Sequence, residues 1–122
     1  QKKIVVDDID FGVWYVDAYE YPERYIGKEI EFKAQAFRPR GMKEDMFVPV
    51  REIMTCCADD VRHYGYPCKM KEKKNLVMKA WDKVRAKFAM EAPQGYGRRQ
   101  PVLYLTSIEE ADAPEESFVY LG

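Results

Sequence analysis

Two adjacent cysteines are the strongest candidates for chemistry in this sequence. Cys56 and Cys57 follow an apolar run that ends at Met54, and the only histidine, His63, comes a few residues later. Structural zinc sites use four thiolate or imidazole ligands. The nearby groups that suit a ligand or a metal are Cys56, Cys57, Asp60, His63 and Cys68. We therefore predict a ligand site here, with zinc as the candidate cofactor and Cys56, Cys57 and His63 as its ligands.

The spacing of the cysteines leaves two other interpretations open. No Cys-x-x-Cys pair is present, and neighbouring side chains on a strand point to opposite faces, so one of the two is expected to face the core. Free cysteine is among the most buried residue types. The Cα atoms of adjacent residues lie about 3.8 Å apart, whereas a disulfide prefers about 4.4 to 6.8 Å, so a disulfide would have to use Cys68. A buried structural cysteine and a reactive thiol remain alternatives to a metal site.

No catalytic group can be assigned from the residue types. A Cys/His couple would need a third group that orients the histidine, and the sequence identifies none. The glycines of the segment 94–99 resemble a phosphate-binding loop, but a strand rather than a helix follows, and the Lys-Ser/Thr of a P-loop is missing. We therefore interpret the protein as a non-enzymatic binding domain.

The charges are distributed unevenly along the chain. The net charge of −1 is the sum of −4 in residues 1–60, +8 in residues 61–100 and −5 in residues 101–122. Basic side chains suited to a nucleic acid form an outward stripe, with tyrosines nearby for base stacking: Lys83, Arg85, Lys87, Arg98 and Arg99. A nucleic-acid-binding module is the alternative function, but the slightly acidic whole chain argues against nucleic acid as a partner.

Length and composition indicate one folded domain spanning residues 1–122. The chain is long enough for one core, and it is 47% apolar and 34% charged. No apolar stretch approaches the roughly 20 residues that a transmembrane helix needs. The chain begins at Gln1 rather than Met, so we expect a mature form or an excised domain from which a signal or an anchor has been removed.

The hydrophobic periodicity predicts one short helix followed by strands. Residues 11–19 place Phe11, Trp14, Tyr15, Ala18 and Tyr19 on one helical face, with Asp8 or Asp10 as the cap. Residues 30–36 alternate between apolar and polar, as a half-buried strand does. Four further strands are expected at 46–54, 63–70, 81–90 and 102–108.

Five consecutive strands with little helix favour a mainly β fold. We predict a five-stranded OB-like barrel, because closure removes the exposed edges of an open sheet, with a small β-sandwich as the alternative. Residues 1–27 are expected to form an extended segment and a helix packed on the barrel. Residues 109–122 are expected to form an acidic C-terminal tail.

Several motifs resemble the soluble C-terminal domain of the YcgQ-like family, uncharacterised bacterial membrane proteins that accompany a predicted permease. The matching stretches are Tyr25-Ile-Gly-Lys before the first barrel strand, Met54-Thr-Cys-Cys-Ala-Asp-Asp after the second, and the closing Ser117-Phe-Val-Tyr. The resemblance covers nearly the whole chain. This sequence departs from it at residues 63–68, which are usually apolar, and near Ala86, where the family has a glycine.

The resemblance implies a place for the domain but no reaction. It implies an OB-like domain outside the membrane and a permease-like membrane protein as partner. It also implies a link to transport, with the vicinal cysteines as the contact if the transported species is a metal. The departures suggest a divergent member that is secreted or lipid-anchored. We therefore expect a membrane-associated or extracytoplasmic location.

Overall fold

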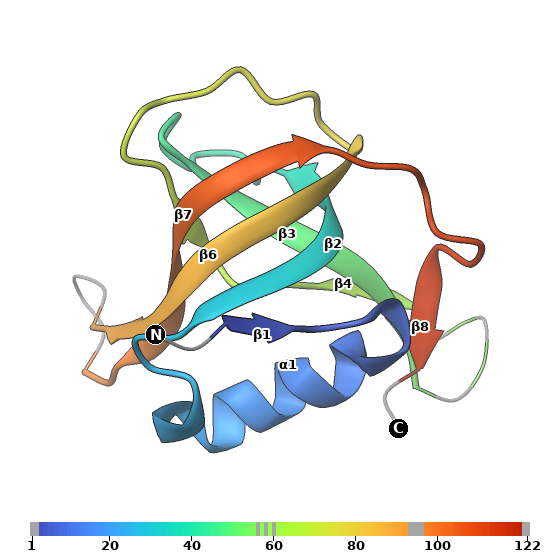
Figure 1. The fold of residues 1–122 in the computed structure, drawn as a ribbon, viewed down its shortest axis with the longest axis horizontal. Coiled ribbons are helices and arrows are strands. Elements are labelled where there is room, and N and C mark those ends of the chain that lie inside the picture. Colours follow the sequence, from blue (N-terminus) through green and yellow to red (C-terminus); the bar gives the residue numbers. More distant parts are fainter. Residues whose placement is uncertain (1–2, 56, 58, 60, 93–96, 121–122) are drawn as a thin grey trace.

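Strands that alternate between buried and exposed residues make up most of the structure (Figure 1). The computed structural model describes residues 3–55, 57, 59, 61–92 and 97–120. In chain order the elements of these residues are β1 (Lys3–Val5), the 3-10 helix η1 (Asp8–Asp10), α1 (Phe11–Glu20), η2 (Pro22–Arg24), β2 (Glu29–Phe37), β3 (Met46–Met54), β4 (Arg62–Tyr64), β5 (Cys68–Lys69), β6 (Trp81–Glu91), β7 (Gln100–Glu110) and β8 (Phe118–Tyr120).

Five of these strands close into a barrel. The neighbours around the ring are β2, β6, β7, β5, β3 and again β2, and only β5 and β7 pair in parallel. If the five barrel strands are numbered by their order in the chain, their order around the ring is one, four, five, three and two. Strands three and five are the parallel pair. This closed ring confirms the predicted five-stranded OB-like barrel and excludes the β-sandwich.

The inner faces of the barrel strands build the core as the alternation predicts. On β2 the side chains of Ile30, Phe32, Ala34 and Ala36 are buried, and on β6 those of Val84, Ala86 and Phe88 are buried. The helix α1 closes one end of the barrel, where the Trp14 ring lies 5.4 Å from Phe32 and 5.7 Å from Tyr66 between centroids. Each of the larger apolar side chains, such as Ile30, Phe32 and Phe88, stabilises the fold by about 2 kcal/mol through burial.

Two expectations about the helix are wrong. Tyr19, placed on the buried face by the periodicity, is 55% exposed and lies in the last turn of the helix. Asp10 precedes the helix, but it has helical backbone angles and its side chain makes no cap bond among the described residues. A capping side chain normally sits on an extended residue, and here η1 leads directly into α1. The side chain of Asp8 instead contacts Arg51.

The third predicted strand is two short strands, β4 and β5, with a bend between them. At the bend, a Cβ atom on Gly65 would lie 2.2 Å from the carbonyl oxygen of Pro49, so only glycine permits this approach. Pro67 has no N–H group to donate to a ladder. Both short strands pair antiparallel with β3 in one register, β4 with its later half and β5 with its earlier half, and β5 also pairs with β7.

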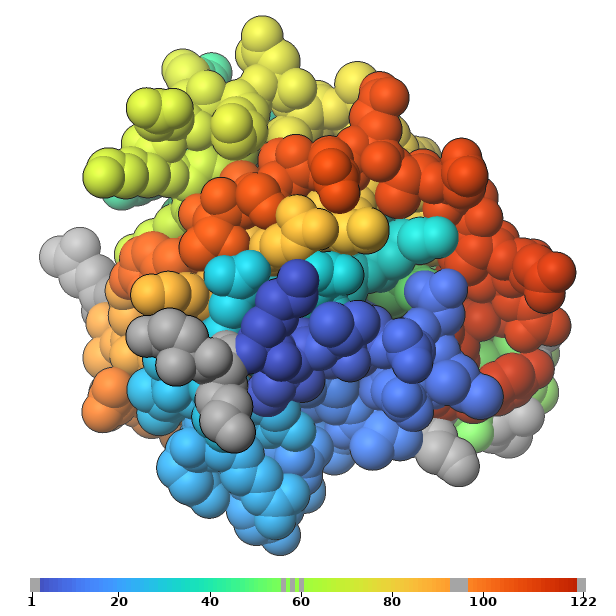
Figure 2. All heavy atoms as spheres, viewed as in Figure 1, coloured from blue at the N-terminus to red at the C-terminus, as the bar shows by residue number. Residues whose placement is uncertain are grey.

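The N-terminal and C-terminal segments lie side by side against the barrel, as Figure 2 shows on its right-hand side. β8 lies within the segment expected as an acidic tail and pairs in parallel with the end of β3, matching Ile53 with Val119. It also contacts η1 and α1. In the part of the chain that the structure describes, no helix is long and apolar enough to cross a membrane.

Candidate functional site

The two halves of the candidate site come from one hairpin. β3 and β4 are antiparallel, with Glu52 opposite His63 and Ile53 opposite Arg62, and the connection between them contains the vicinal cysteines. Cys57 is exposed in this connection. Cys56 and Asp60 lie outside the described residues. The structure therefore places Cys57 in the connection and His63 on β4, opposite Glu52.

Glu52 is the centre of a small polar group on the outer face of the hairpin. The imidazole Nε2 of His63 lies 3.6 Å from Glu52 Oε2, and the Ser117 hydroxyl donates a 3.2 Å hydrogen bond to Glu52 Oε1. Opposite residues on an antiparallel pair project from the same face, which brings the histidine to the carboxylate. The hydroxyl points to the carboxylate and not to the imidazole, so the group lacks the nucleophile-to-base contact of a serine hydrolase.

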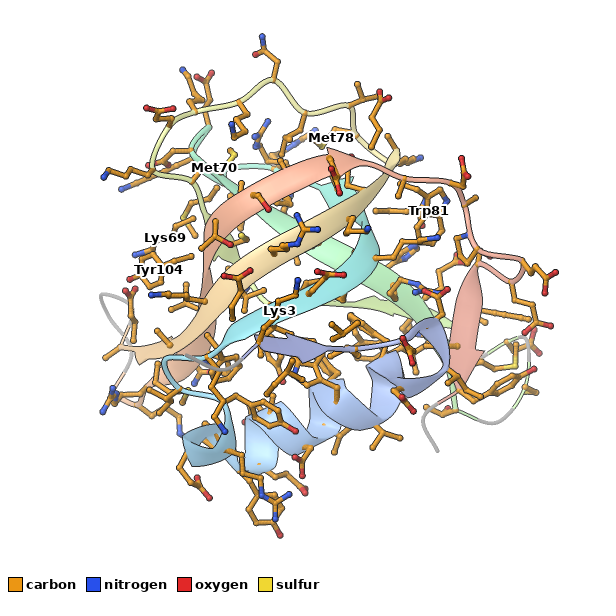
Figure 3. All side chains as sticks on the ribbon, in the orientation of Figure 1. Lys3, Lys69, Met70, Met78, Trp81 and Tyr104 are labelled. Atoms are coloured by element: carbon orange, nitrogen blue, oxygen red, sulfur yellow. The ribbon has the colours of Figure 1, made fainter. Side chains whose placement is uncertain are left out.

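A cleft of about 420 Å³ opens beside this polar group. Its apolar walls come from Phe37, Val50 and Trp81, and Glu52 and His63 contribute polar groups. Figure 3 shows Trp81 where β6 begins, on the opposite side of the view from Tyr104. The cleft combines apolar walls with a few polar groups, which is the usual composition of a small-ligand site.

A tight turn holds one wall of the cleft in place. Lys79, which lines the cleft, has a positive φ of 71°. Its N–H donates to the carbonyl of Ala36 at 2.8 Å, and its own carbonyl accepts a 2.9 Å bond from the Gln35 side chain. Left-handed backbone at a residue other than glycine persists where surrounding bonds enforce it. The turn is therefore fixed to β2, and the cleft is a preformed feature.

Cys68 lies apart from the other candidate ligands. It is completely buried on β5, between Phe47 of β3 and Leu103 of β7 in the ladder. Burial raises the pKa of its thiol from 9.0 to about 12, so the thiol stays protonated at neutral pH. Cys68 is a core residue, whereas His63 is exposed on the outer face.

The described residues do not by themselves form a metal site. Within residues 3–55, 57, 59, 61–92 and 97–120, no three His, Cys, Asp or Glu side chains are close enough to hold one ion. The prediction of a site at Cys56, Cys57 and His63 depends on a residue beyond these ranges. It stays a prediction.

Two of the five residues of the predicted basic stripe, Lys83 and Arg85, are paired with carboxylates. The register sets Glu31 beside Arg85, and the Arg85 Nε atom lies 2.8 Å from Glu31 Oε1. Lys3, labelled in Figure 3, contacts the same carboxylate oxygen at 2.8 Å, and Glu109 lies 3.7 Å from both Lys83 and Arg85. Lys83 and Arg85 are therefore part of an ion-pair ladder across β1, β2, β6 and β7.

The remaining members of the stripe are exposed. Lys87 lies on the outer face of β6, and Arg98 and Arg99 lie just before β7. Arg99 donates to the Met90 carbonyl at 3.1 Å. Of the tyrosines proposed for base stacking, Tyr66 is buried and Tyr96 lies outside the described residues. Nucleic-acid binding by this face stays a prediction.

Sequence reasoning missed a buried arginine. Arg51 is fully buried and donates to Asp8 at 2.8 Å and to the Lys33 carbonyl at 3.3 Å. Its guanidinium carbon lies 5.1 Å from the centroid of the Trp81 ring. Arg51 lies two residues after Pro49 and two residues before Ile53, so the period of two on β3 places all three on the same face. This spacing is the sequence signal from which its inward position could have been predicted.

Comparison with known proteins supports the family resemblance. Residues 1–121 match the DUF1980 C-terminal domain. The chain is 24% identical over 122 residues to UPF0703 protein YcgQ of Bacillus subtilis (strain 168), covering all of this chain and 43% of that protein. The chain thus spans less than half the length of this relative.

One solved structure aligns with most of the chain at low similarity. A putative aspartyl-tRNA synthetase from Leishmania major Friedlin aligns with 90% of this chain and 20% of its own length, at 12% identity and a TM-score of 0.44. The family match covers nearly every residue and agrees with the resemblance seen in the motifs. The chain therefore belongs to the family of the DUF1980 C-terminal domain.

Proposed function

We propose that this protein is a non-enzymatic binding domain of a membrane-associated, permease-linked assembly, and that the β3–β4 hairpin carries its ligand site. The supporting observation is the cleft of about 420 Å³ on the flank of the hairpin, where Glu52 and His63 meet the apolar walls. The polar group contains no activated nucleophile, which favours binding over turnover. The link to a permease and the extracytoplasmic location rest on the resemblance to the YcgQ-like family.

The proposal has two parts, a cleft and a metal contact. The cleft takes the apolar portion of a small ligand, and the Cys56-Cys57 segment is the metal contact. Zinc ligands lie about 2.0 to 2.3 Å from the metal. A zinc ion held by both cysteines and His63 would therefore bring all three side chains within this distance of the ion.

Zinc binding tests the metal part directly. The protein purified under reducing conditions is expected to hold stoichiometric zinc, and a Cys56→Ser/Cys57→Ser variant is expected to lose it. The matched control is Cys68→Ala, which removes a thiol from the core and is expected to keep the metal. A weaker zinc affinity in His63→Ala would assign the histidine as a ligand. Absence of zinc from all these proteins contradicts the metal part.

Dye binding tests the cleft separately. Anilinonaphthalene sulfonate is expected to bind the folded protein and to quench Trp81, which lines the cleft, more than Trp14, which is buried under the barrel. Phe37→Ala removes one wall of the cleft and is expected to weaken dye binding. Tyr104→Ala, which removes an exposed ring elsewhere on the barrel, serves as the control. Equal loss in both variants would contradict a site in the cleft.

A further inference from the structure

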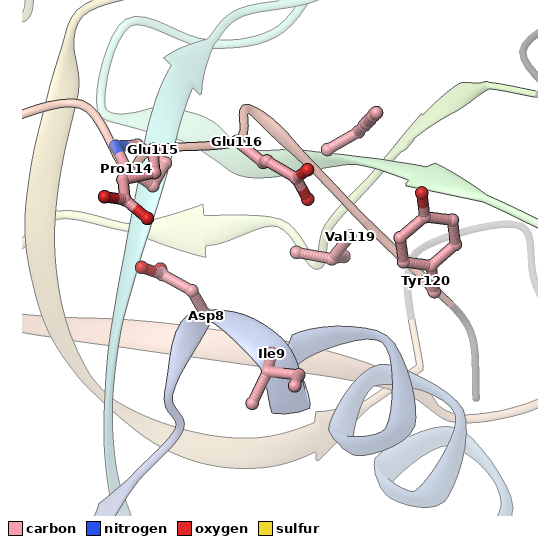
Figure 4. Close-up of a pocket in the computed structure, with 8 residues that line it drawn as sticks. Asp8, Ile9, Pro114, Glu115, Glu116, Val119 and Tyr120 are labelled. Carbon is pink, nitrogen blue, oxygen red and sulfur yellow. The ribbon is translucent and has the colours of Figure 1, made fainter.

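A second groove, distinct from the cleft at His63, lies between η1 and the C-terminal strand. Its volume is about 470 Å³, and it runs between η1 on one side and β8 with the residues before it on the other (Figure 4). These elements contact each other directly, so the groove is formed by the two ends of the chain. Neither of the two parts of the proposed site uses it.

The groove has an apolar surface that is unusually open to solvent. Ile9, on its η1 side, is 79% exposed, and Tyr120, on its β8 side, is 55% exposed. Val119 lies between them and is buried. A gathering of exposed apolar side chains around a concavity is typical of an interaction site. The surface therefore fits an apolar side chain of a partner.

The rim of the same groove is negatively charged. Asp8, Glu115 and Glu116 line it, and none of the described residues that line it is a lysine, arginine or histidine. Asp8 is already paired with Arg51 at 2.8 Å, whereas both glutamates are exposed. The C-terminal residues 101–122, which include this rim, contain five acidic residues and no basic ones. The rim is complementary to positive charge.

We propose that this groove docks a basic amphipathic segment of a partner protein. An apolar side chain of the segment packs against Ile9, Val119 and Tyr120, and its flanking lysines or arginines pair with Glu115 and Glu116. Charge complementarity selects this occupant, because the carboxylates repel the anionic headgroups of a membrane and the phosphates of a nucleic acid. Amphipathic segments commonly bind in grooves of this kind, with apolar anchors inside and charges at the rim.

The test uses a fluorescein-labelled peptide of lysine and leucine in amphipathic order, measured by fluorescence anisotropy. The native protein is expected to bind it, more weakly as salt is added, because the rim charges are exposed. Glu115→Gln/Glu116→Gln is expected to weaken binding by about threefold to tenfold. Ile9→Asn is expected to weaken binding while leaving its salt dependence unchanged. Thermal unfolding of each variant checks that the fold is retained.

Controls separate a built groove from general attraction between opposite charges. Glu23→Gln/Glu72→Gln removes two exposed carboxylates away from the groove and is expected to bind like the native protein. Three results would each overturn the proposal. They are an equally weakened peptide affinity in this control, tight binding of a peptide with glutamate in place of lysine, and no peptide binding by the native protein. A dimer in sedimentation that Glu115→Gln/Glu116→Gln dissociates would also overturn it, by assigning the groove to a second copy of this chain.

Discussion

The buried guanidinium of Arg51 on β3 donates a 2.8 Å hydrogen bond to the carboxylate of Asp8 on η1, 43 residues earlier in the chain. Arg51 also lies against the Trp81 ring and donates to the carbonyl of Lys33. Its Nε and Nη2 atoms are buried without a hydrogen-bond partner in the part of the chain that the structure describes. One side chain thus joins the N-terminal segment, the barrel and a wall of the cleft.

Substitution of Asp8 and substitution of Arg51 are expected to lower the free energy of unfolding by different amounts. Asp8→Asn leaves the buried guanidinium without its anionic partner, and we expect it to lower the free energy of unfolding by about 1 to 3 kcal/mol. Arg51→Met removes the buried charge together with its unsatisfied nitrogens, so we expect a smaller loss. Urea unfolding of the two variants measures both values. A larger loss for Arg51→Met would show that the guanidinium itself stabilises the fold.

The bend between β4 and β5 is expected to require glycine. Gly65→Ala would place a methyl group 2.2 Å from the Pro49 carbonyl oxygen, and backbone must move to relieve the overlap. We expect a loss of about 1 to 3 kcal/mol in the free energy of unfolding. At Gly97 an added Cβ meets nothing within 4 Å among the described atoms, so Gly97→Ala is the matched control. Similar unfolding midpoints for the two variants would contradict the packing argument.

The ion-pair ladder is expected to make stability depend on acid pH. Hydrogen bonds from Lys3 and then Arg85 lower the pKa of Glu31 below its ordinary value of 4.5. The contribution of Glu31 is therefore fully present above pH 4.5 and is lost as the pH falls through its lowered folded-state pKa.

Glu31→Gln isolates that contribution. At neutral pH we expect it to cost about 1 kcal/mol of stability, and less at high salt, because the carboxylate lies at the barrel surface. Below pH 4.5 the difference between native protein and variant should shrink, which urea unfolding at several pH values would measure. A difference that stays constant across this range would mean that Glu31 acts through its shape and not its charge.

The thiol of Cys68 is expected to be unreactive toward alkylating reagents in the folded protein. The Cys56→Ser/Cys57→Ser variant retains only this thiol, whose pKa is raised to about 12 by burial. Iodoacetamide should therefore modify it slowly at mildly alkaline pH and rapidly once urea unfolds the chain, because the thiolate is the reactive species. Mass spectrometry follows the modification. Rapid alkylation under native conditions would show that the barrel opens at β5.

Oligonucleotide binding by the outer face of β6 is expected to be weak. Arg85 and Lys83 are already near carboxylates, so few counterions would be released from a bound phosphate chain. We expect no salt-dependent binding of single-stranded DNA by the native protein. Glu31→Gln/Glu109→Gln frees the basic side chains and should increase any binding. Tight, strongly salt-dependent binding by the native protein would instead support the alternative of a nucleic-acid-binding module.

Patterns within one strand or helix predicted most of the fold correctly. The alternation of Ile30 to Ala36 and of Val84 to Phe88 identified the inner faces of β2 and β6, and the helical spacing of Phe11, Trp14 and Ala18 identified the face that covers the barrel. These signals are readable because residues on one face of an element recur at a fixed period. The resemblance seen in the sequence also indicated the family, which the match over residues 1–121 confirms.

The sequence by itself determined the mainly β class, most of the inward-facing residues and the family resemblance, because each of these follows from local periodicity or from residues along the chain. Only the tertiary structure decided which polar groups meet. Glu52 contacts His63 across a hairpin and Ser117 from 65 residues away, and Arg51 reaches Asp8 across 43 residues. Such pairings depend on how the strands close and on where β8 lies, and no local pattern records either. The cleft and the acidic groove are therefore properties of the closed barrel.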